Sequence, residues 1–130
     1  MDRADTLSAE RMWNIFSNIG AYRKYVNDYF GKYDLLLSPS LAVPAFDIGD
    51  EPDVIGGKQV PHRLWGFTPF TYLFNMTGNP GASAPAGFSS DGLPIGLQIV
   101  GDMKDEVSVL ASSAALEEAR PWADKRPPVS

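Results

Sequence analysis

The chain has 130 residues, of which 44% are hydrophobic and 21% charged, a balance typical of one soluble globular domain. Eleven Lys and Arg against sixteen Asp and Glu give a net charge of -5, and the sequence contains no basic run. We therefore expect no binding to nucleic acid and no polybasic attachment to an anionic membrane. The chain has no cysteine, so it cannot form disulfides, and its one histidine cannot make a multi-histidine metal site. With no apolar run of ~20 residues and no signal-peptide start, we expect one cytoplasmic domain over residues 1–130, with a loose tail over 120–130.

Residues 8–30 are predicted to form a long amphipathic helix. Apolar side chains recur there at spacings of three and four, which places them on one helical face. Thr6 or Ser8 can accept backbone N–H hydrogen bonds at the start, and Gly31 can end the helix in the left-handed conformation. The apolar positions are Met12, Ile15, Phe16, Ile19, Tyr22, Val26, Tyr29 and Phe30.

A short strand and a long loop are expected next. The uninterrupted apolar run Leu35–Leu37, which Ser38 and Pro39 follow, is typical of a strand buried on both faces. A helix and a strand in such close succession indicate an α/β fold. Residues 38–64 contain four prolines and three glycines without any periodicity, so we expect a long loop that is functional or mobile.

An aromatic-rich segment is predicted to be helical from Thr68 to Met76. Thr68 and Pro69 fit an N-cap that is followed by a proline in the first turn. Trp65, Thr68 and Tyr72 then stand at i, i+3 and i+7, which places them on one face of the helix. A helix that is apolar all round is either buried or borders an apolar pocket, and burial as plain core is the simpler interpretation.

Two strands that pair as a hairpin are predicted after this helix. Residues 82–88 are predicted to form a strand of mostly small residues, and residues 94–100 alternate between apolar and other side chains. The turn signal Asp91-Gly92 lies between the two segments. We therefore expect these strands to be neighbours in a sheet.

A final helix is predicted to end near Ala119. Asp102 or Asp105 can cap its first turn, and Pro121 prevents its continuation. The helix contains four apolar residues that are expected to face inward: Val107, Leu110, Ala111 and Ala114.

Ser83 and His62 are the candidates for nucleophilic catalysis. The run Gly81-Ala82-Ser83-Ala84-Pro85 resembles a G-x-S-x-G elbow, but Pro85 replaces the second glycine and no helix follows the serine. We therefore interpret Ser83 as a small residue in a tightly packed strand. His62 lies in the long loop, where no neighbour identifies it as the base of a triad, and we interpret it as a loop or surface residue.

The long loop also holds an acidic cluster and a glycine pair. The cluster lacks the alternating spacing of a calcium loop, so we interpret it as a solvated acidic loop. Gly56-Gly57-Lys58 lacks the spacing and the hydroxyl of a phosphate loop, and we interpret it as a turn. No metal site and no cofactor are therefore predicted. The acidic residues are Asp47, Asp50, Glu51 and Asp53.

Several segments in order resemble the C-terminal region of the amidase signature family. They cover about residues 9–127, and their combination is specific although each alone is weak. The segments are Tyr33-Asp34-Leu35-Leu36-Leu37-Ser38-Pro39-Ser40, the run from Phe74 to Gly87, the run from Asp91 to Gly101, Asp105-Glu106 with its helix, and Pro121-Trp122-Ala123-Asp124.

This resemblance implies a portion of an amide hydrolase. The family has a large α/β fold with helices around a mixed sheet and uses a Ser–cis-Ser–Lys triad, which lies in the N-terminal two-thirds of its usual length. This sequence has no G-G-S-S-G-G-S run, so we assign no catalytic residue. We expect a C-terminal fragment of the α/β/α fold, with the N- and C-terminal helices packed on a small mixed sheet that includes a β-hairpin.

The resemblance also implies substrate-binding residues. The family's aromatic helix lines the acyl side of the substrate channel, which by position gives Trp65, Thr68 and Tyr72 this role. Asn75, near the C-terminal end of that helix, could bond exposed carbonyl groups.

We therefore expect the structural and substrate-pocket portion of an amide hydrolase, without activity of its own. Its partner would be either a complementary N-terminal amidase chain or further copies of itself, because open strand edges and apolar surface promote pairing with other chains. A small amide would be the substrate if an N-terminal chain completed the site. The alternative is a stand-alone module that self-associates or binds small ligands. A third hypothesis, a hydrolase that uses Ser83 or His62, conflicts with the motif analysis above.

Overall fold

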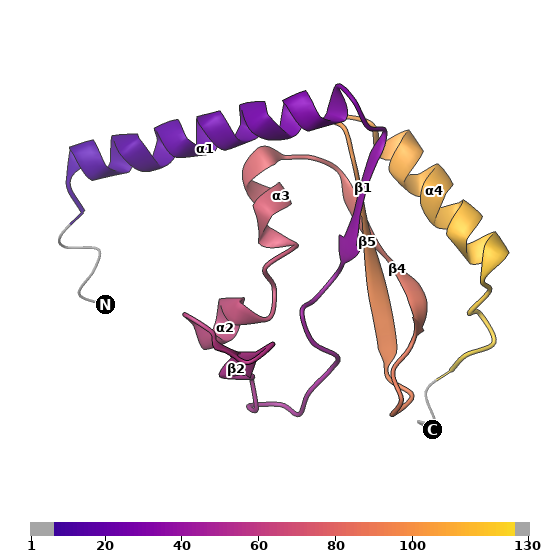
Figure 1. The fold of residues 1–130 in the computed structure, drawn as a ribbon. Helices are drawn as coiled ribbons and strands as arrows, with labels where there is room; N and C mark the ends of the chain where they lie inside the picture. The colour runs from indigo at the N-terminus through magenta and orange to yellow at the C-terminus, as the bar shows by residue number, and fades with distance from the viewer. Residues whose placement is uncertain (1–6, 127–130) are drawn as a thin grey trace.

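The computed structural model describes residues 7–126, with two long helices flanking a small sheet (Figure 1). Four helices and five strands follow one another along this part of the chain, in the order α1, β1, β2, β3, α2, α3, β4, β5 and α4. Of the predicted tail, residues 127–130 lie outside the described residues. The elements are α1 (Ala9–Phe30), β1 (Leu35–Pro39), β2 (Val54–Ile55), β3 (Lys58–Gln59), α2 (Arg63–Gly66), α3 (Tyr72–Thr77), β4 (Gly81–Phe88), β5 (Pro94–Gly101) and α4 (Glu106–Ala119).

The main sheet has three strands in the order β1-β5-β4. β4 and β5 pair as the predicted hairpin, and Gly92 in their turn has a φ of 79°, a conformation that glycine adopts without strain. β1 pairs with the other edge of β5. The α/β class is confirmed, but both pairings are antiparallel, so the mixed sheet that we expected is not found among residues 7–126.

The two faces of the sheet carry separate apolar clusters. Opposite residues in an antiparallel sheet point to the same face, so Leu36 of β1 and Val100 of β5 share one face. Val100 packs there with Val26 and Phe30 of α1 and Phe74 of α3. The other face is covered by α4, and its buried members are Ala84, Ile99 and Val109.

Only the C-terminal half of α1 reaches the core. Ser8 caps the helix as predicted, because its hydroxyl accepts a hydrogen bond from the Arg11 N–H at 3.2 Å. Thr6, the other predicted cap, lies outside the described residues. Gly31 follows the helix at a φ of -66°, so the predicted left-handed cap is wrong. Trp13 is 73% exposed, and the first half of α1 projects past the other elements (Figure 1).

The inward face predicted for α4 is wrong. Val107 and Leu110 are 77% and 66% exposed, and Ala111 and Ala114 are exposed as well. Val109 is buried against the sheet instead. The helix carries apolar residues on two sides, and the side that contacts β4 and β5 is the one that contains Val109 and Leu116.

The prediction that β1 is buried on both faces is also wrong. Leu35 and Leu36 are half-buried, whereas Leu37 is 59% exposed. β1 is an edge strand, and α4 contacts the other two strands of the sheet, β4 and β5. An apolar edge strand with one open face offers a surface on which further structure can pack.

The helix predicted from Thr68 to Met76 begins four residues later than expected, at Tyr72. Trp65 belongs to α2, Thr68 lies between two helices, and α3 begins only at Tyr72. The Ala42 N–H donates to the Phe67 carbonyl at 3.0 Å, so this carbonyl is engaged outside the helix. Trp65, Thr68 and Tyr72 therefore do not share one face of a continuous helix.

The long loop contains one short hairpin. β2 and β3 pair antiparallel, and Gly56 and Gly57 join them with φ angles of 57° and 76°. Two residues with positive φ form the turn that suits a tight hairpin. The glycine pair is therefore a turn, as predicted.

Asp105 is the cap of α4, and its charge should make the stability of the chain pH-dependent. Its carboxylate accepts a hydrogen bond from the Ser108 N–H at 3.2 Å, and hydrogen bonding by Ser108 lowers the pKa of Asp105. The native state therefore binds the proton less readily than the unfolded state. The contribution of this cap is present above about pH 4 and is lost as the pH falls through the lowered pKa.

Asp105→Asn should weaken this dependence, because asparagine caps a helix without titrating. Thermal unfolding, followed by circular dichroism at several pH values between about 2 and 6, should show a smaller rise of the midpoint with pH in the variant. Asp91→Asn, in the exposed hairpin turn, is the matched control. An unchanged pH profile in Asp105→Asn would contradict the role of this cap.

Candidate functional site

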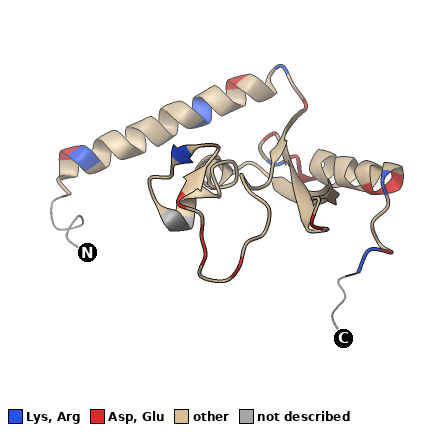
Figure 2. Ribbon diagram, turned by 60° about the horizontal axis from the view of Figure 1, so that its bottom comes forward, with Lys and Arg blue, Asp and Glu red and all other residues tan. Residues whose placement is uncertain are grey.

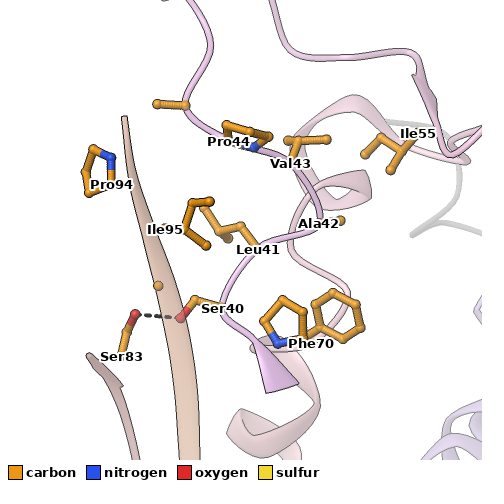
Figure 3. Close-up of a pocket in the computed structure, with 13 residues that line it drawn as sticks. Ser40, Leu41, Ala42, Val43, Pro44, Ile55, Phe70, Ser83, Pro94 and Ile95 are labelled. Atoms are coloured by element: carbon orange, nitrogen blue, oxygen red, sulfur yellow. Dashed lines mark hydrogen bonds between the residues drawn. The ribbon is translucent and has the colours of Figure 1, made fainter. Parts of the chain in front are cut away.

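A cavity of about 610 Å³ lies between the segment that follows β1 and the beginning of β5 (Figure 3). The segment from Ser40 to Ala45 forms one side, and Pro94, Ile95 and Gly96 form the other. Phe70, which precedes α3, and Ile55 of β2 extend the apolar lining. The cavity is therefore built by residues that are far apart in the sequence. Its lining residues are Pro39, Ser40, Leu41, Ala42, Val43, Pro44, Ala45, Ile55, Phe70, Ser83, Pro94, Ile95 and Gly96.

Two serine hydroxyls meet at one end of the cavity. The Oγ atoms of Ser40 and Ser83 are 2.5 Å apart and form a hydrogen bond across β5 (Figure 3). The Ser40 N–H also donates to the Gly96 carbonyl at 2.9 Å, which holds the backbone of Ser40 against β5. The serines can approach each other because the residue between them has no side chain: a Cβ on Gly96 would lie 2.6 Å from one Oγ and 2.7 Å from the other.

The hydroxyl pair belongs to a polar patch on the α1 and α3 face of the sheet. Ser38 and Gln98 are opposite each other in the register of β1 and β5, and Ser83 is opposite Gln98 on β4. The Ser38 hydroxyl donates to the Gln98 side-chain oxygen at 3.4 Å. Ser40 and Gln98 are buried. The helices α1 and α3 cover the other end of this face, so the polar patch is left beside the cavity.

None of the described residues that line the cavity is ionisable, and Ser40 and Ser83 are the polar side chains among them. The pKa of Tyr22 is raised by burial and that of Asp105 is lowered by hydrogen bonds from Ser108, but neither residue lines the cavity. Figure 2 shows Lys and Arg dispersed over several elements. The described lining is therefore apolar apart from the two hydroxyl groups.

The four predicted substrate-binding residues lie elsewhere. Trp65 in α2, Tyr72 in α3 and Asn75 in α3 are exposed, and Thr68 is half-buried between the helices. The Thr68 hydroxyl donates to the Trp65 carbonyl at 3.2 Å. None of the four lines the cavity, although Phe70 lies between Thr68 and Tyr72 and does.

The other candidates do not form a catalytic constellation in the described part of the chain. Ser83 is an exposed residue of the edge strand β4 beside the cavity, so its interpretation as a tightly packed residue is wrong. None of the described residues that line this cavity is ionisable, so none of them could act there as a base. Residues 7–126 contain no group of three His, Cys, Asp or Glu side chains that could hold a metal ion.

Sequence reasoning missed Ser40 and Phe70 as members of a site. Ser40 was visible only as the end of the motif Tyr33–Ser40, and Phe70 only as one aromatic residue among several. The signal that could have found Ser40 is the alternation Leu36, Ser38, Ser40, which places two hydroxyls on one face of a strand and its extension.

None of the helices among the described residues is both long enough and apolar enough to cross a membrane.

Comparisons with known proteins give one consistent family. A family model described as Amidase matches residues 2–110. An acylamidase from Rhodococcus erythropolis is 37% identical over 126 residues, which are 96% of this chain and 24% of that protein. One subunit of the glutamyl-tRNA(Gln) amidotransferase from Synechococcus sp. is 41% identical over 100 residues, 77% of this chain and 18% of that protein.

A solved structure agrees with this match. The crystal structure of a bacterial aryl acylamidase of the amidase signature enzymes matches with a TM-score of 0.85 and 35% sequence identity. The match covers 97% of this chain and 27% of that chain. Almost the whole of this chain matches the two acylamidases, but it spans only about a quarter of their length.

Proposed function

The chain belongs to the amidase family, and on this basis we propose that it forms the structural and substrate-pocket portion of an amide hydrolase whose Ser–cis-Ser–Lys triad lies outside these residues. The observation that carries this proposal is the match to the aryl acylamidase over 97% of this chain and 27% of that chain. The printed sequence contains no G-G-S-S-G-G-S run. The chain by itself is therefore proposed to be inactive.

The exposed apolar residues support a larger assembly. Trp13 and Phe16 project from the unpacked half of α1, and Val107 and Leu110 cover the outer side of α4. A helix that is apolar on two sides is typical of burial between two layers. Apolar surface of this kind marks an interface, so both helices are proposed to pack against the remaining amidase fold.

The proposed partner is the complementary N-terminal part of an amidase. The alternative partner is a second copy of this chain, which would make it a self-associating or small-ligand-binding module. The match to one subunit of an amidotransferase makes an assembly with other chains a reasonable expectation. We propose that this chain and its partner are located in the cytoplasm.

The residues Trp65, Thr68, Tyr72 and Asn75 are proposed to line the acyl side of a substrate channel that the remaining fold completes. The exposure of Trp65, Tyr72 and Asn75 supports this role, because their side chains are open to a further layer. The whole domain, residues 1–130, is proposed to fold as one unit with that layer.

A chimera tests the proposed function. This chain would replace the matching segment of the Rhodococcus erythropolis acylamidase, and hydrolysis of an acylated amine substrate of that enzyme would be followed. We expect the chimera to hydrolyse the substrate, because the missing triad is then supplied, and the purified 130-residue chain to leave it intact.

Two outcomes would contradict this proposal. The first is a folded chimera without hydrolysis. The second is hydrolysis by the chain alone, and loss of that activity in Ser83→Ala would then assign it to Ser83. Sedimentation of the chain alone tests its self-association: we expect a dimer or a higher oligomer that buries strand edges or the aromatic face of α1, and a stable monomer at high concentration would contradict this.

A further inference from the structure

We propose that a small groove between the bulge in β4 and the segment after α4 binds a single-ring carboxylate through the guanidinium group of Arg120. This bulge groove has a volume of about 150 Å³. It is lined by Pro85, Ala86, Gly87, Phe88, Arg120, Pro121 and Trp122. None of these residues lines the larger cavity beside Ser40 and Ser83, and the inference does not depend on the proposed function.

The bulge in β4 fixes one side of the groove. Pro85 and Gly87 are opposite consecutive residues of β5, so Ala86 between them has no partner on that strand. The Ala86 carbonyl group instead accepts a hydrogen bond from Nη1 of Arg120 at 3.4 Å. The irregularity of the strand thereby holds the guanidinium group beside the groove.

The charge of Arg120 is available to a ligand. A guanidinium group has five N–H donors, and the described contacts of Arg120 use one of them. Arg120 takes part in no ion pair within the described part of the chain. The donors of a guanidinium group form a planar fork that matches the two oxygens of a carboxylate, so a carboxylate is the ligand group that this site favours.

The walls of the bulge groove favour an aromatic ring next to that carboxylate. Phe88 is 47% exposed and Trp122 is half-buried, so both present apolar surface to the groove. A ring that packs against them buries apolar area and gains ring contacts. The volume corresponds to about five water molecules in the liquid, which suits one ring rather than a drug-sized ligand.

Exposure and nearby charge determine the strength of this binding. Arg120 is exposed, and Glu117 and Glu118 precede it in the sequence without lining the groove. The attraction between Arg120 and a carboxylate is therefore screened by water and salt. We expect dissociation constants in the millimolar range that rise with ionic strength.

Three probes separate the contributions of the charge and the ring. Benzoate has both, benzyl alcohol has the ring without the charge, and acetate has the charge without the ring. In ¹H–¹⁵N spectra of the 130-residue chain, benzoate should cause saturable shifts at residues 86–88, 120 and 122. Benzyl alcohol and acetate should each bind there at least about fivefold more weakly, and an increase in NaCl from about 50 to 500 mM should weaken benzoate binding at least about twofold.

Three variants locate the binding. Arg120→Gln should weaken benzoate binding at least about fivefold, because it removes the charge and the forked donors. Arg120→Lys should weaken it less, since lysine keeps the charge without the planar fork. Arg126→Gln is the matched control: Arg126 is exposed, lies outside the groove, and its loss changes the net charge by the same amount. This control should bind benzoate as the unaltered chain does.

Four results would overturn the inference. They are absent or unsaturable benzoate shifts at the residues of the bulge groove, equal affinity for benzoate and benzyl alcohol, unchanged binding in Arg120→Gln, and equal losses in Arg120→Gln and Arg126→Gln. The last of these would show that benzoate responds to the net charge of the chain and not to a site.

Discussion

Phe74→Ala is expected to lower the free energy of unfolding by about 3 kcal/mol, because it removes a large buried ring and leaves a cavity. Phe74 lies in α3 and packs with Val26 and Phe30 of α1 and with Val100 of β5. It is the buried residue that α3 contributes to this cluster, beside the half-buried Leu73, so its loss weakens the packing of α3 against both neighbours. Urea unfolding followed by circular dichroism measures the change.

Leu110→Ala is the matched control for this prediction. The Leu110 side chain is large and apolar like that of Phe74, but it lies on the exposed side of α4. Surface substitutions of this kind change stability by less than about 0.5 kcal/mol. Equal losses in the two variants would contradict the core described above. In the chimera, by contrast, Leu110→Ala should become destabilising if the remaining fold covers this side of α4.

The hairpin of β4 and β5 could be predicted because its information is local. The small residues before the Asp91-Gly92 turn and the alternation after it lie within one stretch of chain, and the strands formed as expected. The cap of α4 is local in the same way, since Asp105 bonds the N–H of the residue three positions later. Signals that need only neighbouring residues therefore predicted structure well.

The faces of the long helices could not be predicted for a different reason. α4 carries Val107 and Leu110 on one side and Val109 and Leu116 on the other, so its periodicity alone does not decide which side meets the sheet. The decision depends on β5 as well, since Gly101 leaves room for Val109: a Cβ there would lie 2.8 Å from a methyl carbon of Val109. In α1, the apolar face is continuous along the sequence, but the other described elements cover only its second half.

The cavity was beyond sequence reasoning because it depends on register. Ser40 and Ser83 are separated by 43 positions and meet only because β5 lies between β1 and β4 and carries Gly96 at the crossing point. A shift of one residue in either pairing would turn one serine to the other face. The motif Tyr33–Ser40 pointed to the strand that carries the site, but not to the partner of Ser40.

Gly101→Ala is expected to lower the free energy of unfolding by about 2 kcal/mol through overpacking. A Cβ at this position would lie 2.8 Å from a methyl carbon of Val109 and 3.1 Å from the Asp105 carbonyl oxygen. The Asp105 carbonyl belongs to the backbone at the start of α4, so the helix must move away from β5 to make room. Urea unfolding of the variant measures the loss.

A double-mutant cycle identifies the cause of that loss. Val109→Ala by itself creates a cavity and is destabilising, but in the Gly101→Ala background it also removes the clashing methyl group. The two changes should therefore cost less together than the sum of their separate effects. Gly20→Ala is the control, because nothing lies within 4 Å of a Cβ there and alanine should stabilise α1 by about 0.5–1 kcal/mol. Strict additivity in the cycle would show that Gly101 matters for its backbone freedom and not for the close approach of α4.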